Sequence, residues 1–407
     1  MTETSFVRVG WLIDGAGGPV QENVVLKIQN GYIESVDPAY QDTTLNDRAV
    51  VDLSYCTILP PLVDCHVHLF MSAATDEQVR RKQLSAGYRE LKPVIREHLH
   101  HLFSHGVLGV RDGGDRGGFV LRFRSENEMH PLVNLAVSGR AWHREKRYGA
   151  LIGRSNGAER LAKAYLENVE PVEFVKLVNS GLNSLMVFGK ETSSQFTAEE
   201  ITELVAAAAA NNQKVMVHAN GREPVRTAVE AGCCSIEHGF FMGKENLRRM
   251  ADRNTFWCPT VFTMKAYGTN LAPGAQNVDH RVIAGNMEHQ LEQLAYAREL
   301  GVQVAMGTDA GSLGVLHGES MVEEMKLFKK AGYSLVEIIR SATSVGASLL
   351  GIDSFGELVK GKHASFLVCR GTPAQLPRKL SYLEDIYIDG VSCEMYRKNP
   401  YKNVVAK

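Results

Sequence analysis

Short apolar runs alternate with longer helical patterns through the middle of the chain, and most of these runs are bounded by Gly, Asn or Pro. Short uninterrupted apolar runs are typical of buried parallel strands. A first strand is expected to end near His68, and seven more are expected at 106–111, 133–138, 174–178, 215–218, 235–238, 255–259 and 302–306. Eight strands alternating with helices is the count of a barrel, so we predict an α/β protein with a (β/α)8 TIM barrel.

The clearest helix of this region is expected at 197–211, where Thr197 can cap the first turn and Glu200 completes a capping box. The alanines from Ala206 to Ala210 favour a helix, and the Asn pair after them ends it. A doubly wound open sheet is the competing architecture, less favoured because no Gly-x-Gly-x-x-Gly follows an early strand. We expect the glycine-rich segment 113–118 to be a flexible loop after the second strand, not a phosphate-binding loop.

Both ends of the chain have the alternating pattern of β-structure instead. Strands at 24–28 and 32–36 flank Asn30-Gly31, a strong hairpin signal. Near the other end, strands are expected at 364–368, 386–388 and 391–396, with Asp389-Gly390 turning between the last two. We predict that residues 1–58 and 353–407 form one small β-sandwich domain, and that residues 59–352 form the barrel.

The overall composition narrows the class of protein. Of 407 residues 44% are hydrophobic and the formal net charge is −1, so no global field favours nucleic acid or an acidic membrane surface. The seven cysteines lack framework spacing, which favours reduced thiols in the cytoplasm. Residues 1–5 show no signal-peptide pattern, and no apolar run is long enough to span a membrane. A cytoplasmic enzyme is expected, and a homo-oligomer is left open.

Six side chains that could hold metal ions lie at or near the carboxyl ends of the expected strands. Such ends converge on one face of a barrel, so residues far apart in sequence can form one site. His66 and His68 are two apart and share one face of a strand, a weak signal alone that His218 and His238 strengthen, since imidazole is a preferred zinc ligand. Asp309 adds a carboxylate after the last strand.

The sixth residue, Lys176, does not fit this set by itself, because a protonated amine cannot bind a cation. The residues alone leave two other interpretations of it open. In one, Lys176 is a buried lysine paired with Glu173; in the other, it binds an anionic substrate.

These motifs resemble the amidohydrolase superfamily, in the branch with two metal ions. The resemblance rests on the six residues in order and on their flanks, which are 59–64 before His66, 235–239 around His238, 307–310 around Asp309, and 361–368 near the end. The overall sequence pattern is most similar to that of Xaa-Pro and Xaa-Arg dipeptidases and imidazolonepropionase-like proteins. One departure is Ser365, where an acidic residue is common.

The resemblance implies two divalent ions, with zinc the expected metal, and a CO₂-derived carbamate on Lys176 that bridges them. His66, His68 and Asp309 would hold one ion, and His218 and His238 the other. A metal-bridging hydroxide would attack the amide, with Asp309 as the catalytic proton shuttle. The resemblance therefore implies hydrolysis of a C–N amide bond in a small substrate, either a dipeptide or an N-acyl amino acid.

Several other functions are weighed against this one. A deaminase of the superfamily places Glu three residues after the His of strand five, where this chain has Gly221, and such enzymes lack the lysine. Cyclic amide hydrolysis and phosphotriesterase-like or lactonase activity use similar ligands and remain open. A non-catalytic binding protein is disfavoured, because such relatives typically lose ligands and this chain keeps all six.

The substrate contacts are expected in the loop at 139–149 and just beyond it, where His143, Arg144, Tyr148 and Arg154 could grip a substrate carboxylate. A solvated basic loop explains the same residues equally well. His317 follows the last strand and is either a substrate contact or a surface histidine. The segment 71–99 is long for a strand-to-helix connection, so it is either a lid or a helical excursion.

Overall fold

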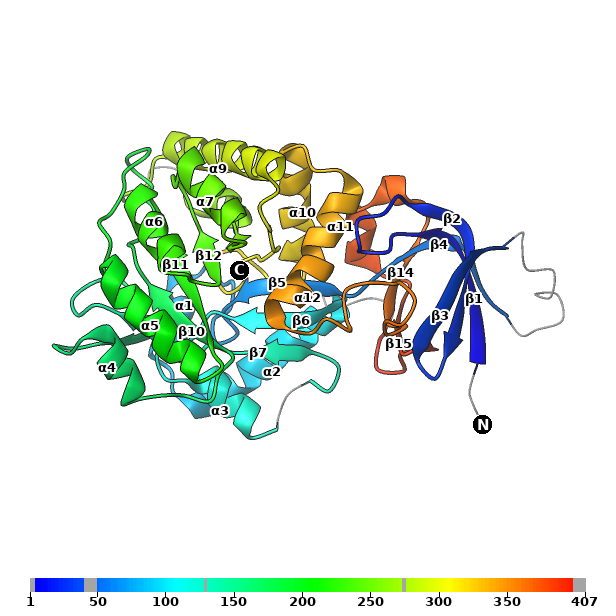
Figure 1. Cartoon of the computed structure of the whole chain (residues 1–407), viewed down its shortest axis with the longest axis horizontal. Coiled ribbons are helices and arrows are strands. Elements are labelled where there is room, and N and C mark those ends of the chain that lie inside the picture. Colours follow the sequence, from blue (N-terminus) through cyan, green and yellow to red (C-terminus); the bar gives the residue numbers. More distant parts are fainter. Residues whose placement is uncertain (1–3, 40–49, 128–129, 273–275, 398–407) are drawn as a thin grey trace.

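Strands from both ends of the chain share one sheet in the computed structural model, which describes residues 4–39, 50–127, 130–272 and 276–397. This sheet lies at one end of an elongated molecule, beside a larger part built of parallel strands and helices (Figure 1). The seven strands run in the order β16-β15-β14-β4-β1-β2-β3. Their bounds are Thr4–Leu12 (β1), Gln21–Gln29 (β2), Tyr32–Pro38 (β3), Val50–Leu59 (β4), Phe366–Arg370 (β14), Asp385–Ile388 (β15) and Val391–Ser392 (β16).

The two predicted turns of this region are confirmed. Asn30-Gly31 joins β2 to β3 and Asp389-Gly390 joins β15 to β16, each pair with positive φ as a tight hairpin requires. The last predicted strand, 391–396, is shorter than expected and ends at Ser392.

The predicted β-sandwich is replaced by one curled sheet. The sheet bends until the amide of Ala364 donates to the carbonyl of Gly31 at 2.8 Å, and the curl encloses apolar side chains from both chain ends, such as Val9, Leu26 and Phe366. A single sheet can enclose this core because its natural twist brings the outer strands toward each other. The boundaries at 58 and 353 stay predictions.

The larger part contains two parallel sheets, ordered β13-β12-β11-β10-β8-β9 and β5-β6-β7. The strands of the first sheet are Ala141–His143 (β8), Gly153–Ser155 (β9), Phe174–Val178 (β10), Lys214–Ala219 (β11), Ser235–His238 (β12) and Phe256–Cys258 (β13). Those of the second are Leu62–Val67 (β5), Val107–Asp112 (β6) and Asn134–Ala136 (β7). Two predictions need correction here: the third strand is shorter than 133–138, and the loop expected at 139–149 contains β8, with β9 just beyond it.

The expected eighth strand, 302–306, is not a strand but an extended link between the two sheets. Val304 bridges Trp257 of β13, and the amide of Cys65 in β5 donates to the carbonyl of Met306 at 2.9 Å. Among the described residues the strands thus form two linked sheets and not one continuous ladder. They still face a common interior, because one buried cluster contains Val63, Phe174, Met216, Cys258 and Ala305, each from a different strand or link.

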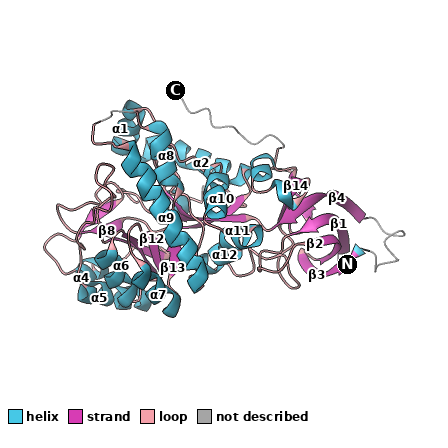
Figure 2. Ribbon diagram, turned by 90° about the horizontal axis from the view of Figure 1, so that it is seen from above, coloured by secondary structure: helices cyan, strands magenta, loops and turns pink. Residues whose placement is uncertain are grey.

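Helices cover the outside of these sheets (Figures 1 and 2). Their bounds are Glu77–Ser85 (α1), Tyr88–Ser104 (α2), Phe119–Ser125 (α3), Leu161–Leu166 (α4), Ala198–Ala210 (α5), Arg222–Glu230 (α6), Lys244–Asp252 (α7), Phe262–Asn270 (α8), His280–Leu300 (α9), Ser320–Lys330 (α10), Leu335–Ala342 (α11) and Ser344–Leu350 (α12). Two short 3-10 helices, Pro373–Gln375 and Arg378–Tyr382, precede β15. The capping box of α5 is confirmed, with Thr197 and Glu200 bonded reciprocally at 3.2 and 2.9 Å.

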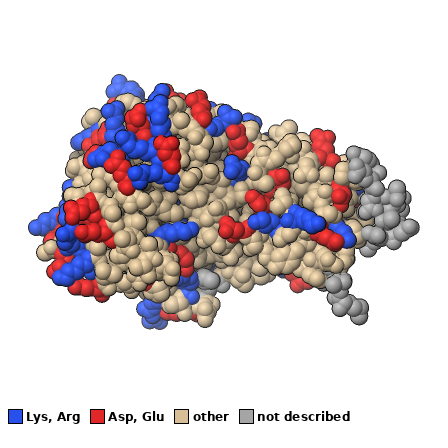
Figure 3. Space-filling view, viewed as in Figure 1, with Lys and Arg blue, Asp and Glu red and all other residues tan. Residues whose placement is uncertain are grey.

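The helices, the surface charges and the cysteines can be compared with the expectations from composition. In the described part of the chain, every helix is too short or too polar to cross a membrane. Basic and acidic side chains are interspersed among the described residues on the face drawn in Figure 3, so this face offers no single-sign patch to nucleic acid. All seven cysteines are free thiols.

Candidate metal centre

One cavity, of about 280 Å³, collects side chains from the carboxyl ends of the strands. The six residues proposed as metal ligands from the sequence all line it: His66, His68, Lys176, His218, His238 and Asp309. His66, Lys176, His218 and His238 come from β5, β10, β11 and β12, while His68 and Asp309 lie just beyond strand or link ends. The convergence expected from parallel strands is therefore present in the structure.

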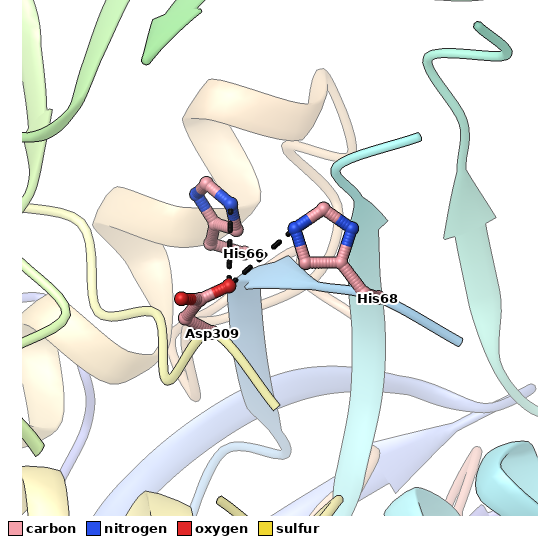
Figure 4. A group of neighbouring side chains, drawn as sticks. All are labelled: His66, His68 and Asp309. Atoms are coloured by element: carbon pink, nitrogen blue, oxygen red, sulfur yellow. Dashed lines mark ion pairs between the residues drawn. The ribbon is translucent and has the colours of Figure 1, made fainter. Parts of the chain in front are cut away.

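His66, His68 and Asp309 form the tightest group (Figure 4). The Oδ1 atom of Asp309 lies 3.7 Å from Nε2 of His66 and 3.4 Å from Nε2 of His68. The two Nε2 atoms and the carboxylate oxygen thus point at one another, as ligands of one ion would. The ring centroid of His238 lies 4.9 Å from that of His66 and 4.7 Å from that of His218, which continues the cluster across the cavity.

Each of the four histidines has one ring nitrogen engaged by an outer partner. The contacts are His66 Nδ1 with Glu237 Oε2 at 2.6 Å, His68 Nδ1 with the Gly114 carbonyl at 3.0 Å, His218 Nε2 with the Gly181 carbonyl at 3.1 Å, and His238 Nδ1 with Thr260 Oγ1 at 2.8 Å. A proton on the engaged nitrogen leaves the other with a free lone pair, the arrangement that outer partners of metal-bound imidazoles impose. This pairing is the observation that the donor set fits metal ions.

The histidines are also in the protonation state that metal binding needs. Burial, with Lys176 nearby, lowers the pKa of His68 to about 3 and that of His218 to about 4. The pKa values of His66 and His238 fall well below the usual range for the same main reason, burial. All four imidazoles are therefore neutral near pH 7, and neutral imidazole is the ligand form.

A buried ion pair behind the site holds His66 in place. The fully buried Glu237 binds His66 with one carboxylate oxygen and accepts from Arg111 Nη2 at 2.8 Å with the other. Arg111 also donates to the Cys65 carbonyl at 2.7 Å and to Ser235 Oγ at 2.8 Å. Neither charged residue was predicted from the sequence, although each lies inside an apolar strand where a buried charge needs a partner.

A second cluster, of His66, Glu237 and Cys258, also has metal-ligating atoms close together. It is poorly suited to a metal. Glu237 is already held by Arg111, and burial raises the pKa of the Cys258 thiol well above its usual range. A protonated thiol is not a metal ligand.

Lys176 is almost fully buried, and its Nζ lies 3.4 Å from Nε2 of His66. The interpretation that it pairs with Glu173 is wrong, because Glu173 binds Arg124 at 2.5 Å. Burial lowers the pKa of Lys176, although the negative charge of Glu237 acts to raise it. Burial therefore favours the neutral amine of Lys176 over its ammonium form.

Asp309 is held in an uncommon backbone conformation. Its φ is 59°, its amide donates to the His66 carbonyl at 2.7 Å, and its Oδ2 accepts from Ser312 Oγ at 2.9 Å. His238 also has a positive φ, 67°. Left-handed backbone at residues other than glycine is stored strain that tends to occur at functional sites. Burial raises the pKa of Asp309 above its usual range.

The substrate contacts expected from the sequence lie in different places. Tyr148 lines the cavity, but His143, Arg144, Arg154 and His317 do not. Arg144 is bound to Glu200 at 2.6 Å, and Arg154 donates to the Asn168 carbonyl and lies 3.7 Å from Glu170.

The two histidines are buried away from the cavity. His143 contacts the Arg144 carbonyl at 2.9 Å. His317 stacks on His98 with ring centroids 3.9 Å apart, and its Nε2 lies 3.3 Å from the His68 carbonyl. The expectation of substrate contact or surface exposure for His317 is therefore wrong; it supports the backbone beside a proposed ligand.

The segment 71–99 contains α1 and most of α2, and two of its residues, Met71 before α1 and Arg80 within it, line the cavity. Arg80 was not predicted from the sequence to lie in the site. Its signal was weak, because an arginine on a polar helix usually faces solvent.

The glycine-rich segment 113–118 packs against the site. Asp115 accepts hydrogen bonds from the amides of Gly117, Phe119 and Val120, which occupies the groups a phosphate would need. A Cβ at Gly113 would lie 2.8 Å from Cε1 of His68. Glycine is therefore required there by close approach to the histidines.

Comparison with known proteins assigns the chain to a family. The model of the amidohydrolase family matches residues 57–396, most of the sequence, so the chain belongs to this family.

Individual relatives are distant. An ochratoxinase of Aspergillus niger is 23% identical over 184 residues, which are 45% of this chain and only 38% of that protein. An imidazolonepropionase of Bacillus cereus is 24% identical over 58% of this chain and 61% of its own length. The crystal structure of a Xaa-Pro dipeptidase with methionine bound in its active site superposes with a TM-score of 0.80 and 24% identity, over 96% of this chain and all of the other. This likeness establishes a TIM-barrel-like fold with an extra domain.

Proposed function

We propose that this protein hydrolyses linear amides, either dipeptides or N-acyl amino acids, with two divalent metal ions held by the six cavity residues. The observation that carries the proposal is the set of four neutral imidazoles, each engaged by an outer partner on one ring nitrogen, around Asp309 and Lys176. Zinc suits this histidine-rich set. The cytoplasmic location and a homo-oligomer stay predictions from the sequence.

In this proposal His66, His68 and Asp309 hold one ion, and His218 and His238 hold the other. Bound there, the ions would acidify a shared water and polarise the amide carbonyl. Lys176 would join the two halves as a carbamate. Its neutral amine would form a bond to the carbon of CO₂ as one C=O π bond breaks, and the released proton would pass to water. A side chain that repels cations would thereby become an anion. The burial of Lys176 among neutral imidazoles supports this assignment.

Asp309 is assigned the proton transfers. It takes a proton from the water whose oxygen adds to the amide carbon, and it gives this proton to the nitrogen when the C–N bond breaks, so the products are an acid and an amine. Ser312 fixes the outer oxygen of Asp309 and leaves Oδ1 toward the histidines. Glu237 and Arg111 keep His66 oriented from behind.

The amide is favoured over the other substrates by two points. The family acts on carbon–nitrogen bonds, and the dipeptidase with similar fold binds an amino acid, methionine, in its active site. Much of the cavity lining is apolar, including Leu151, Leu182, Phe240 and Met264, which suits an acyl group or side chain.

The test is a screen of the zinc-loaded protein with dipeptides, N-acyl amino acids, cyclic amides, lactones and a phosphotriester. We expect the linear amides to be hydrolysed with a kcat/KM at least about 10²-fold higher than that of the other substrates. One methylene more or less in an apolar pocket usually changes kcat/KM by about that factor or less, so a gap this large indicates a preference for the bond type. Preference for a lactone or the phosphotriester would contradict the proposal.

A further inference from the structure

Arg80 differs from Arg144 and Arg154, the two arginines that the sequence predicted to contact substrate. It lies on α1, the first helix after the His66–His68 segment, and it lines the metal cavity. Within the described residues that line the cavity, Lys176 is the one other lysine or arginine, beside the four histidines. Arg144 and Arg154, by contrast, point away from the cavity to glutamates.

The hydrogen bonds of Arg80 fix one part of the guanidinium and leave the rest available. Its Nη1 donates to the carbonyls of Ser72, Ala74 and Gly311 at 3.2, 3.4 and 3.3 Å. In the described part of the chain, no group accepts from its Nε or Nη2, and no carboxylate lies within 4.0 Å. A planar fork of N–H donors that is anchored on one side, and lacks an anion on the other, is suited to bind a carboxylate in two places.

The position of Arg80 indicates which part of a substrate it would meet. It bonds Gly311, two residues after Asp309, the group assigned to protonate the leaving nitrogen. Tyr267, also on the cavity wall, interacts with Ser312, the residue that donates to Asp309. The positive charge of Arg80 acts to lower the pKa of Tyr267, so the two side chains are close. Arg80 therefore lies on the side of the cavity where the leaving amine departs. In an amino acid, the carboxylate carbon is only two bonds from that nitrogen.

We propose that Arg80 binds the α-carboxylate of an amino acid leaving group, so that the enzyme prefers amides whose amine part is a free α-amino acid. This inference rests on the proposed amide hydrolysis and adds to it the residue that selects the substrate. Arg80 is a binding residue in it, and takes no part in the proton transfers.

The kinetic test pairs a substrate change with a residue change. N-acetyl-L-leucine is compared with N-acetyl-L-leucinol, in which a CH₂OH group replaces the carboxylate and the scissile amide is the same. Arg80→Met is expected to lower kcat/KM by about 10²-fold for the acid and by less than about threefold for the alcohol, because only the acid offers a charge to pair. Equal losses for both substrates would show a structural role and overturn the proposal.

Arg81 provides the matched control on the same helix. Its side chain is 72% exposed and paired with Glu77, so Arg81→Met should leave both substrates and their ratio unchanged. If Arg80→Met does not fold, Arg80→Lys keeps the charge but loses the planar fork, and the acid-to-alcohol ratio should still fall. A wild-type ratio in Arg80→Lys would overturn the proposal.

A binding measurement separates this inference from the proposed function. The unfolding temperature of the metal-loaded protein is measured with L-leucine and with L-leucinol. We expect L-leucine to raise it in the wild type and in Arg81→Met but not in Arg80→Met, and L-leucinol to have little effect. If this pattern is found but no amide is hydrolysed, the proposed function is refuted, while the binding of a carboxylate by Arg80 is supported. If L-leucine still raises the unfolding temperature of Arg80→Met, the proposed role of Arg80 is refuted.

Discussion

His218 is held through its Nε2 atom, whereas His66, His68 and His238 are held through Nδ1. The nitrogen left for a metal therefore differs between β11 and the other strands. The sequence could predict which side chains meet here, because strand ends converge. It could not predict which nitrogen each presents, since Glu237, Gly114, Gly181 and Thr260 approach only in the folded chain.

The same limit applies to the charged residues that the sequence analysis missed. Arg111 and Glu237 are 126 positions apart and lie inside different strands. Each by itself is an isolated charge in an apolar run. Their pairing depends on β6 and β12 facing one interior, which no local pattern contains.

The roles of Asp309 as ligand and as proton shuttle can be separated by Asp309→Asn. Asparagine keeps a ligating oxygen but cannot accept the proton, so kcat should fall by about 10²–10⁴-fold while most of the metal is retained. KM should change less, because the lost interaction acts mainly in the transition state. The wild-type rate should fall toward acid pH, where Asp309 becomes protonated, and the variant should lack this limb. Near-normal turnover with full metal would show that Asp309 is only a ligand.

Lys176 can be tested by removal and chemical rescue. Lys176→Ala removes the proposed bridging anion, so metal affinity and activity should both fall, by about 10-fold or more for each, as for loss of other metal-supporting groups. Acetate or formate in the buffer should restore part of both. An unmodified Lys176 amine in a crystal with both metals fully bound would contradict the carbamate.

At the scale of elements, the strands with long apolar runs were predictable and the short ones were not. The runs at 174–178 and 235–238 coincide with β10 and β12. The segment of β8 and β9 was missed because each is three residues long, too short for periodicity to show. The link at 302–306 has an apolar pattern, yet it makes only single bridges to its neighbours.

Helix α8 begins on a buried carboxylate that makes stability depend on pH. Glu324 accepts hydrogen bonds from the amides of Val261 and Phe262 at 2.9 and 2.7 Å, and burial raises its pKa to about 8. The folded state thus binds more protons than the unfolded state between the ordinary pKa, 4.5, and about 8. The contribution of Glu324 to the free energy of unfolding is therefore lost as pH rises through this window.

Glu324→Gln removes this titration and one acceptor. It should lower the free energy of unfolding by about 1–3 kcal/mol near pH 5, the cost of an unpaired buried amide, and by less near pH 8. Denaturant unfolding of the metal-free protein at several pH values measures this difference. The control is Glu323→Gln, a more exposed side chain bound to Lys265 and Lys326, whose effect should be small and flat over the same range. A constant difference for Glu324→Gln would refute the account.

At the scale of the whole molecule, the two chain ends depend on each other. The sequence indicated that both are β-rich, and the structure places β14 against β4 within one sheet. The sequence did not distinguish a curled sheet from a sandwich, because both alternate buried and exposed positions.

Deleting residues 366–407 would remove β14, β15 and β16 and expose the fully buried Ile58 and Leu59 of β4. We expect insoluble protein, since an open apolar sheet edge favours aggregation. Soluble expression and activity of the truncated chain, measured against the full chain, would show that the remainder folds without these strands.

The central claim is a centre of two metal ions, and the most direct measurement is a titration of metal-free protein with zinc in which bound metal and amide hydrolysis are followed together. The account predicts that activity rises until about two equivalents per chain are bound and that elemental analysis then finds both. Full activity at one equivalent, with no further change at the second, would contradict it.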